Sequence, residues 1–151
     1  VVDARGKPLK AFELEARAVA SPEAVYAVDR MLVEVIDRGT GAAARGRLPQ
    51  GLVVAGKSGT SSAYRDSWFA GFSGSHVAVV WVGRDDNQPT RLTGASGALA
   101  VWAGLMAGLE TSAWNPPMPE SLAEVWIDYA GGAMADPECG TDVVVVAVPR
   151  E

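Results

Sequence analysis

The chain has 151 residues, of which 48% are hydrophobic and 21% are charged, and its net charge at pH 7 is −5. This composition is that of a folded globular chain, and it excludes the disordered and collagen-like classes. Because the 13 lysines and arginines are scattered singly along an acidic chain, we expect no nucleic-acid partner.

The first 40 residues predict a hairpin and then a helix. Two extended segments flank a glycine-containing turn within residues 1–14, which is typical of a β-hairpin. The residues Ser-Pro-Glu at 21–23 combine a capping hydroxyl, a first-turn proline and an acid that matches the helix dipole. Apolar residues then recur at helical spacing, and Gly39 would tolerate a left-handed position after the last turn. We therefore predict a helix over 22–38.

The middle of the chain predicts a sheet. Residues 39–50 have no apolar period and are expected to form a surface connection. Three extended runs follow, at 52–61, 67–73 and 76–83, and only short polar joints separate them. Because sequential strands with short connections usually pair with one another, we expect three antiparallel strands.

The last third predicts one more helix and a small β extension. Residues 97–110 return to helical spacing, and this helix is expected to lie across one face of the sheet. The prolines within 115–119 cannot continue a helix, because each lacks an amide donor. Apolar runs at 125–129 and 143–148 then predict two short strands. The fold class is therefore α/β in the α+β sense, an antiparallel sheet flanked by helices.

Membrane and redox signals are weak. The longest apolar runs, 77–82 and 143–148, are far shorter than the roughly 20 residues of a membrane-spanning helix. We expect no membrane span in this chain. No basic and apolar leader opens the sequence, and residue 1 is valine, so we expect any targeting signal or anchor to lie upstream. Cys139 is the only cysteine, which excludes an internal disulfide and gives no indication of compartment.

Residues 51–58, with the letters GLVVAGKS, match the phosphate-binding P-loop pattern. A P-loop follows a buried strand and opens a helix. Here the β-forming residues 52–54 lie inside the supposed loop, and the Gly-Thr-Ser-Ser run that follows Ser58 forms helices poorly. The acidic residues after the run 77–82 would suit magnesium, which keeps nucleotide binding as an alternative.

The same region also fits a strand that ends in Lys57-Ser58-Gly59-Thr60. Serine β-lactamases and penicillin-binding proteins carry a Lys-Thr/Ser-Gly element together with a Ser-x-x-Lys nucleophile and a Ser-x-Asn element. An exposed strand edge can dock a peptide-like substrate through main-chain hydrogen bonds. A glycine lets the substrate backbone come close, and a cation beside two hydroxyls suits a carboxylate. A chance match in a solvent-facing strand is the alternative interpretation.

The surrounding sequence resembles the transpeptidase domain of class A, bifunctional penicillin-binding proteins. That family usually shows Ala-Gly-Lys-Thr-Gly-Thr-Thr, then a few residues, then Asp-x-Trp-Phe-x-Gly. The similar segments here are 16–19, 35–41, 55–72, 78–89, 92–98 and 127–139. Residues 78–98 are most similar to the one-B type. The resemblance implies that residues 1–114 form the C-terminal part of the domain, and that 115–151 form a proline-rich boundary and a small β extension.

The resemblance implies a role for each residue of the strand. Lys57 would bind the substrate carboxylate and the serine of the Ser-x-Asn element, and Ser58 and Thr60 would offer hydroxyls to the same carboxylate. The amide of Thr60 would join the oxyanion hole. Ser58 stands where the family more often has threonine, and either hydroxyl serves. The residues expected at the site are Lys57, Ser58, Gly59, Thr60, Ser61 and Ser62, with no metal and no organic cofactor.

Two family elements are missing from the sequence. No Ser-x-x-Lys occurs, and the triplet 112–114, Ser-Ala-Trp, fails as a Ser-x-Asn element at its third position. In the family both lie upstream, so we expect the nucleophile in a missing N-terminal half and no acylation by this chain alone. The implied ligands are a D-Ala-D-Ala stem peptide and β-lactams, at the periplasmic face of the bacterial inner membrane. A serine β-lactamase, a D,D-carboxypeptidase and an inactive binding module remain alternatives.

Other polar and aromatic residues have simpler interpretations. His76, the only histidine, has no acid or cysteine cluster near it in sequence, and we assign it no role. Asp66 is expected to order the joint between two strands, with a solvated turn acid as the alternative. Residues 84–87 predict a charged turn that would bind a cation at most weakly. Core packing is expected for the aromatic residues Trp68, Phe69, Trp81 and Trp102.

Overall fold

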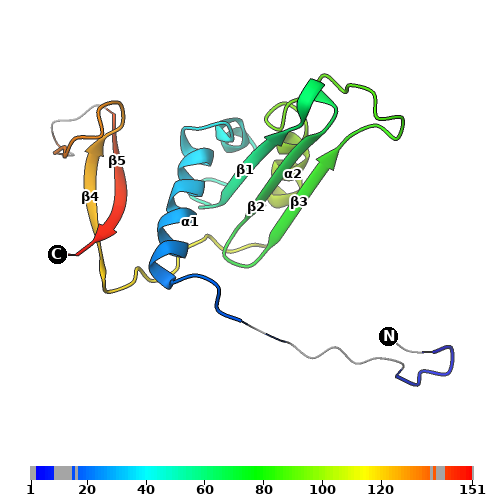
Figure 1. Cartoon of the computed structure of the whole chain (residues 1–151), viewed down its shortest axis with the longest axis horizontal. Coiled ribbons are helices and arrows are strands. Elements are labelled where there is room, and N and C mark those ends of the chain that lie inside the picture. The colour runs from blue at the N-terminus through cyan, green and yellow to red at the C-terminus, as the bar shows by residue number, and fades with distance from the viewer. Residues whose placement is uncertain (1–2, 9–14, 16, 137, 139–141, 151) are drawn as a thin grey trace.

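The computed structural model describes residues 3–8, 15, 17–136, 138 and 142–150. The elements are α1 (Pro22–Asp37), η1 (Ala42–Gly46), β1 (Ala55–Thr60), η2 (Ser62–Tyr64), β2 (Ser67–Phe72), β3 (Val77–Val82), α2 (Ala98–Ala107), β4 (Leu122–Asp128) and β5 (Val143–Pro149). Strands β1, β2 and β3 form one sheet, and β4 and β5 form another. Helix α1 lies between the two sheets, and α2 lies behind the larger one (Figure 1). The architecture is α+β.

The N-terminal hairpin predicted over 1–14 lies largely outside the described residues. Among those that are described, Asp3 and Lys7 close a turn in which the Asp3 amide donates to the Lys7 carbonyl oxygen at 2.9 Å. Gly6 has a φ of +79° within it, a conformation that glycine adopts at little cost. The predicted glycine-containing turn is therefore present.

The start of α1 is confirmed, and the predicted role of Gly39 at its end is wrong. The Ser21 hydroxyl accepts a hydrogen bond from the Ala24 amide at 3.2 Å, and the helix begins at Pro22. Gly39 is not among the described residues with positive φ. A Cβ on Gly39 would instead lie 2.8 Å from the Cα of Val35. Glycine is needed here because the chain passes close to the last turn of the helix.

The three-stranded sheet is antiparallel with the order β1-β2-β3, as predicted. Strand β1 begins three residues later than the predicted run 52–61. Ala55 already pairs with Phe72, the last residue of β2, so residues 52–54 have no partner on that strand. Leu52 and Val54 are buried instead, which explains the apolar pattern that led to the longer prediction.

Helix α2 covers one face of this sheet and forms the core with it. Trp102 is fully buried, and its ring centroid lies 4.9 Å from that of Phe69 on β2. The predicted surface connection 39–50 is partly wrong, since Ala44 and Leu48 are buried and belong to the same cluster. Their contribution is hidden in the sequence because Ala44, in the short helix η1, and Leu48, just beyond it, form no regular apolar period.

The opposite face of the sheet is only partly covered in the described part of the chain, and its open part lies at Trp68 and Trp81. Trp68 and Trp81 are opposite one another on β2 and β3, and they are 44% and 46% exposed. The prediction that these two residues pack in the core is therefore wrong. Strand alternation puts Trp68 on the face opposite to buried Phe69, where helix α1 packs only near the end of the sheet that holds Ala55 and Phe72. For Phe69 and Trp102 the core prediction is confirmed.

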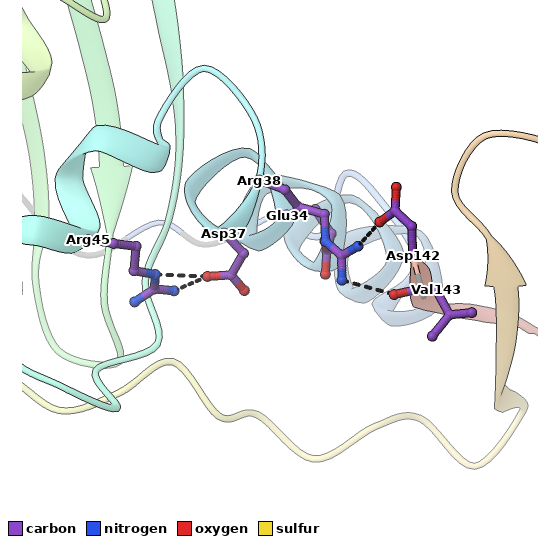
Figure 2. Close-up of polar contacts among 6 residues, drawn as sticks. All are labelled: Glu34, Asp37, Arg38, Arg45, Asp142 and Val143. Carbon is purple, nitrogen blue, oxygen red and sulfur yellow. Dashed lines mark hydrogen bonds and ion pairs between the residues drawn. The ribbon is translucent and has the colours of Figure 1, made fainter. Parts of the chain in front are cut away.

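The predicted β extension is confirmed as the antiparallel pair β4 and β5. Arg38, at the end of α1, joins this pair to the rest of the chain. Its guanidinium donates to the Asp142 carboxylate and to the Val143 carbonyl oxygen, each at 2.9 Å, and pairs with Glu34 at 2.9 Å (Figure 2). The arginine thus connects the last turn of α1 with the start of β5.

We expect Arg38→Ala to loosen the extension from α1. Partly exposed ion pairs contribute at most about 1 kcal/mol each, so amide hydrogen exchange in β5 should accelerate by up to roughly fivefold. Arg45→Ala is the matched control, because Arg45 pairs with Asp37 and has no contact with the extension in Figure 2. Equal exchange rates in β5 for both variants would contradict the role of Arg38 in connecting α1 to β5.

The charged turn predicted at 84–87 is confirmed. Arg84 donates to both carboxylate oxygens of Asp86, at 2.9 and 2.7 Å. This hydrogen-bonded ion pair, helped by the Gln88 amide, lowers the pKa of Asp86 to about 2. Because the pKa is lowered in the folded state, the pairing stabilises the fold at neutral pH and is lost as the pH falls through about 2.

An NMR titration of the Asp86 carboxyl carbon tests this assignment. The midpoint should lie near 2 in the unmodified protein and move toward the ordinary value of 3.8 in Arg84→Ala. Arg47→Ala, which removes an exposed arginine elsewhere on the surface, should leave the midpoint unchanged. A midpoint near 3.8 in all three proteins would show that the pair does not form in solution.

Candidate functional site

The candidate site lies on β1, the edge strand of the larger sheet. Within the described ranges β1 pairs with β2 alone, and no strand occupies its other edge, which is the kind of edge at which an extended ligand can pair. Lys57 and Thr60 are exposed, and Ser58 and Gly59 are half-buried. The four residues of the Lys-Ser-Gly-Thr motif are therefore accessible at one end of an edge strand.

The strand places the lysine and the hydroxyls on opposite faces. Residues directly opposite in an antiparallel pair share a face, and Ser58 and Thr60 are opposite the buried residues Phe69 and Ser67. Their side chains lie on the α2 side, whereas Lys57 lies on the open side. The Lys57 side chain folds back along the strand, and its ammonium donates a hydrogen bond to the Ser58 carbonyl oxygen at 3.0 Å. The cation and both hydroxyls thus flank the same backbone segment.

The Thr60 hydroxyl is held by the loop that precedes α2. The Gly94 amide donates to Thr60 Oγ1 at 2.9 Å, and the loop is fixed in turn by the Ser67 hydroxyl, which donates to the Thr93 carbonyl oxygen at 2.7 Å. An amide can only donate, so Thr60 Oγ1 is an acceptor in this bond and its own hydrogen is free. Thr60 is thereby prepared to donate to an anion.

Glycine is required at position 94 by close packing. A Cβ there would lie 2.6 Å from the Trp68 carbonyl oxygen and 2.7 Å from that of Gly59. The loop therefore lies directly against the β1–β2 ladder at the candidate motif. Sequence reasoning assigned no role to Gly94. Its only signal was its place in the segment 92–98, which resembles the family.

Ser61 and Ser62 lie beyond the end of β1, in the connection to β2. Ser61 Oγ accepts from the Asp66 amide at 2.8 Å, and the Ser61 amide donates to the Asp66 carbonyl oxygen at 3.1 Å. The Trp81 indole donates to the Asp66 carboxylate at 2.9 Å, and this bond, with a smaller contribution from Ser61, lowers the pKa of Asp66. Asp66 orders the joint, as predicted. Ser62 is exposed.

The geometry contradicts the nucleotide-binding alternative. A P-loop wraps phosphates in a loop that opens a helix. Here Lys57 and Ser58 lie inside a strand, and the next element is the three-residue turn η2. Strand β1 continues to Thr60, so no helix begins at Ser58 to supply the amides that a phosphate needs.

The remaining polar groups point to structure rather than to a second site. His76 Nδ1 lies 3.1 Å from both the Ser75 and the Thr111 hydroxyls, which is the satisfied histidine that the sequence favoured. The described residues contain no group of three histidine, cysteine, aspartate or glutamate side chains that could hold a metal. None of their helices has the length and apolar character to cross a membrane. Cys139 lies outside the described residues.

Comparison with known proteins identifies the family. Over 132 residues, or 87% of the chain, the sequence is 40% identical to penicillin-binding protein 1B of Escherichia coli (strain K12). The chain belongs to the penicillin-binding protein family. It is also 35% identical over 81% of its length to penicillin-binding protein 1B of Vibrio cholerae, and 30% identical over 95% to penicillin-binding protein 1A of Clostridium tetani. No family model matches the sequence.

The fold agrees with this assignment. The crystal structure of penicillin-binding protein 1A from Haemophilus influenzae matches 85% of the chain with a TM-score of 0.69 and 23% sequence identity. The match covers 20% of that structure. The chain likewise spans only 15% of the Escherichia coli relative, 16% of the Vibrio relative and 19% of the Clostridium relative. This penicillin-binding protein chain therefore corresponds to a small part of each relative.

Proposed function

We propose that this chain is the C-terminal part of a peptidoglycan D,D-transpeptidase domain, from a class A penicillin-binding protein of the one-B type. Residues 1–114 belong to that domain, and 115–151 form a boundary and a β extension. The observation that supports this most directly is the accessible edge strand β1, on which Lys57, Ser58 and Thr60 flank one backbone segment. Relatives named penicillin-binding protein 1B at 35 to 40% identity support the type.

In this proposal the strand binds the C-terminal end of a stem peptide. The Lys57 ammonium and the hydroxyls of Ser58 and Thr60 bind the terminal carboxylate by charge-assisted hydrogen bonds, which are stronger than neutral ones. Gly59 leaves room for the substrate backbone, and the Thr60 amide stabilises the oxyanion. Ser61 and Ser62 extend the binding surface past the end of the strand.

The nucleophile comes from outside these residues. A serine of a Ser-x-x-Lys element, absent from this sequence, attacks the carbonyl carbon of the penultimate D-Ala, and the terminal D-Ala leaves. An amine of a stem peptide on a neighbouring peptidoglycan strand then takes the acyl group from the serine. A β-lactam reacts with the serine in the same way as the substrate does in the first step, and it remains bound as a stable acyl-enzyme. The full-length protein would act at the periplasmic face of the inner membrane, with its anchor and any glycosyltransferase domain upstream.

Fluorescent penicillin tests the proposal. The full-length protein should be labelled covalently, and the 151-residue chain alone should not. Labelling of this chain would overturn the claim that the nucleophile lies elsewhere, and no labelling of the full-length protein would overturn the assignment as an active transpeptidase. Rapid hydrolysis of the drug by the full-length protein would instead favour a β-lactamase, which shares the Lys-Ser-Gly-Thr element.

A further inference from the structure

The geometry points to Thr40 as a positioning residue that turns the Ser58 hydroxyl into a hydrogen-bond donor toward the substrate carboxylate. The oxygen atoms Thr40 Oγ1 and Ser58 Oγ lie 2.9 Å apart, although 18 residues separate them in sequence. This inference rests on the proposed function, because it assumes that a carboxylate binds beside Ser58.

The end of α1 fixes the backbone of Thr40 from both sides. The Gly39 amide donates to the Glu34 carbonyl oxygen at 3.1 Å, and the Gly41 amide donates to the Val35 carbonyl oxygen at 2.9 Å. A Cβ on Gly41 would lie 2.9 Å from Cδ1 of the fully buried Ile36. The turn 39–41 is therefore packed closely against the last turn of the helix, and it carries the Thr40 hydroxyl to the edge of β1.

The chemistry of the ligand sets the direction of the hydrogen bond. A hydroxyl has one hydrogen to donate, and an ionised carboxylate can only accept. When Ser58 donates to a carboxylate, it has no hydrogen left for Thr40. Thr40 must then be the donor in the bond between them. The result is a chain from Thr40 to Ser58 to the carboxylate, in which each bond polarises the next.

Thr60 shows the same arrangement with a backbone donor. There the Gly94 amide occupies the acceptor side of Thr60 Oγ1 and leaves its hydrogen free. Both hydroxyls of the motif thus have a partner that holds the oxygen and orients the hydrogen toward the ligand. Thr40 does for Ser58 what the fixed amide of Gly94 does for Thr60.

The test compares β-lactam acylation in variants of the full-length protein. The probes are a penicillin with a free carboxylate and its methyl ester, which carries no charge. Thr40→Val keeps the shape and removes the hydroxyl, and it should slow acylation by the free acid by roughly tenfold. Acylation by the ester should change by less than about twofold, because a neutral ester carbonyl is a weaker acceptor. Thr40→Ser, which keeps the hydroxyl, should restore the rate for the acid.

A double-mutant cycle with Ser58→Ala isolates the contact. If Thr40 acts through Ser58, then adding Thr40→Val to Ser58→Ala should cause no further loss. Equal slowing for acid and ester, an undiminished effect of Thr40→Val without the Ser58 hydroxyl, or no effect at all would each overturn the inference. Melting temperatures of the variants separate misfolding from altered positioning. A failure of the unmodified protein to acylate would instead count against the proposed function.

Discussion

Lys57→Ala in the full-length protein is expected to slow acylation by penicillin by on the order of a hundredfold. The carboxylate of the drug loses the only cation of the motif, and the two hydroxyls cannot replace its charge. A bound carboxylate that has lost its cation loses more than the bond itself, because binding has also removed part of its water. The measurement is the second-order rate of acylation with a fluorescent penicillin.

Lys7→Ala is the control for this experiment. Lys7 lies in the exposed turn near the N-terminal end, so its replacement changes the net charge equally without touching β1. Its rate should stay within about twofold of the unmodified protein. If Lys57→Ala acylated as fast as Lys7→Ala, the carboxylate would not bind at this strand. Lys57→Arg should recover only part of the rate, since a planar guanidinium does not reproduce a compact ammonium.

The elements that local patterns determine were predicted well. Ser21 and Pro22 mark the start of α1 because a cap and a first-turn proline act within one turn of the chain. The joints between β1, β2 and β3 are short enough that sequential pairing is the economical topology. The errors arise where burial depends on a distant partner. Trp68 and Phe69 are neighbours with similar side chains, yet α2 covers only Phe69.

The candidate site divides in the same way. Four letters and their strand context were enough to place Lys57 to Thr60 on an extended segment, although alanine, glycine and lysine are depleted in strands and the segment is held by its pairing with β2. The contacts of Thr40 with Ser58 and of Gly94 with Thr60 span 18 and 34 residues. No periodicity reports a contact of this kind. The separation of Lys57 from the hydroxyls onto two faces follows from strand alternation, and it became clear once the pairing with β2 was known.

The largest loss of stability is expected for Trp102→Ala. Trp102 is fully buried and packs on Phe69 with 4.9 Å between ring centroids. Its indole donates a hydrogen bond to the Ala78 carbonyl oxygen at 3.2 Å. A Cβ on Gly71 would lie only 2.6 Å from the indole, so the sheet is shaped around this ring. Removing it leaves a cavity and an unpaired carbonyl group. The expected loss in the free energy of unfolding is about 3–5 kcal/mol.

Trp81→Ala is the matched control, because it removes the same side chain from the open face of the same sheet. Trp81 is 46% exposed, so its replacement leaves no enclosed cavity, and the loss should be about 1–2 kcal/mol. Urea unfolding followed by circular dichroism compares the two, since tryptophan fluorescence would change with the substitution itself. Equal losses would mean that the two faces of the sheet are equally covered in solution. A clearly larger loss for Trp102→Ala would place the core between α2 and the strand that carries Phe69, directly beneath the hydroxyls of the motif.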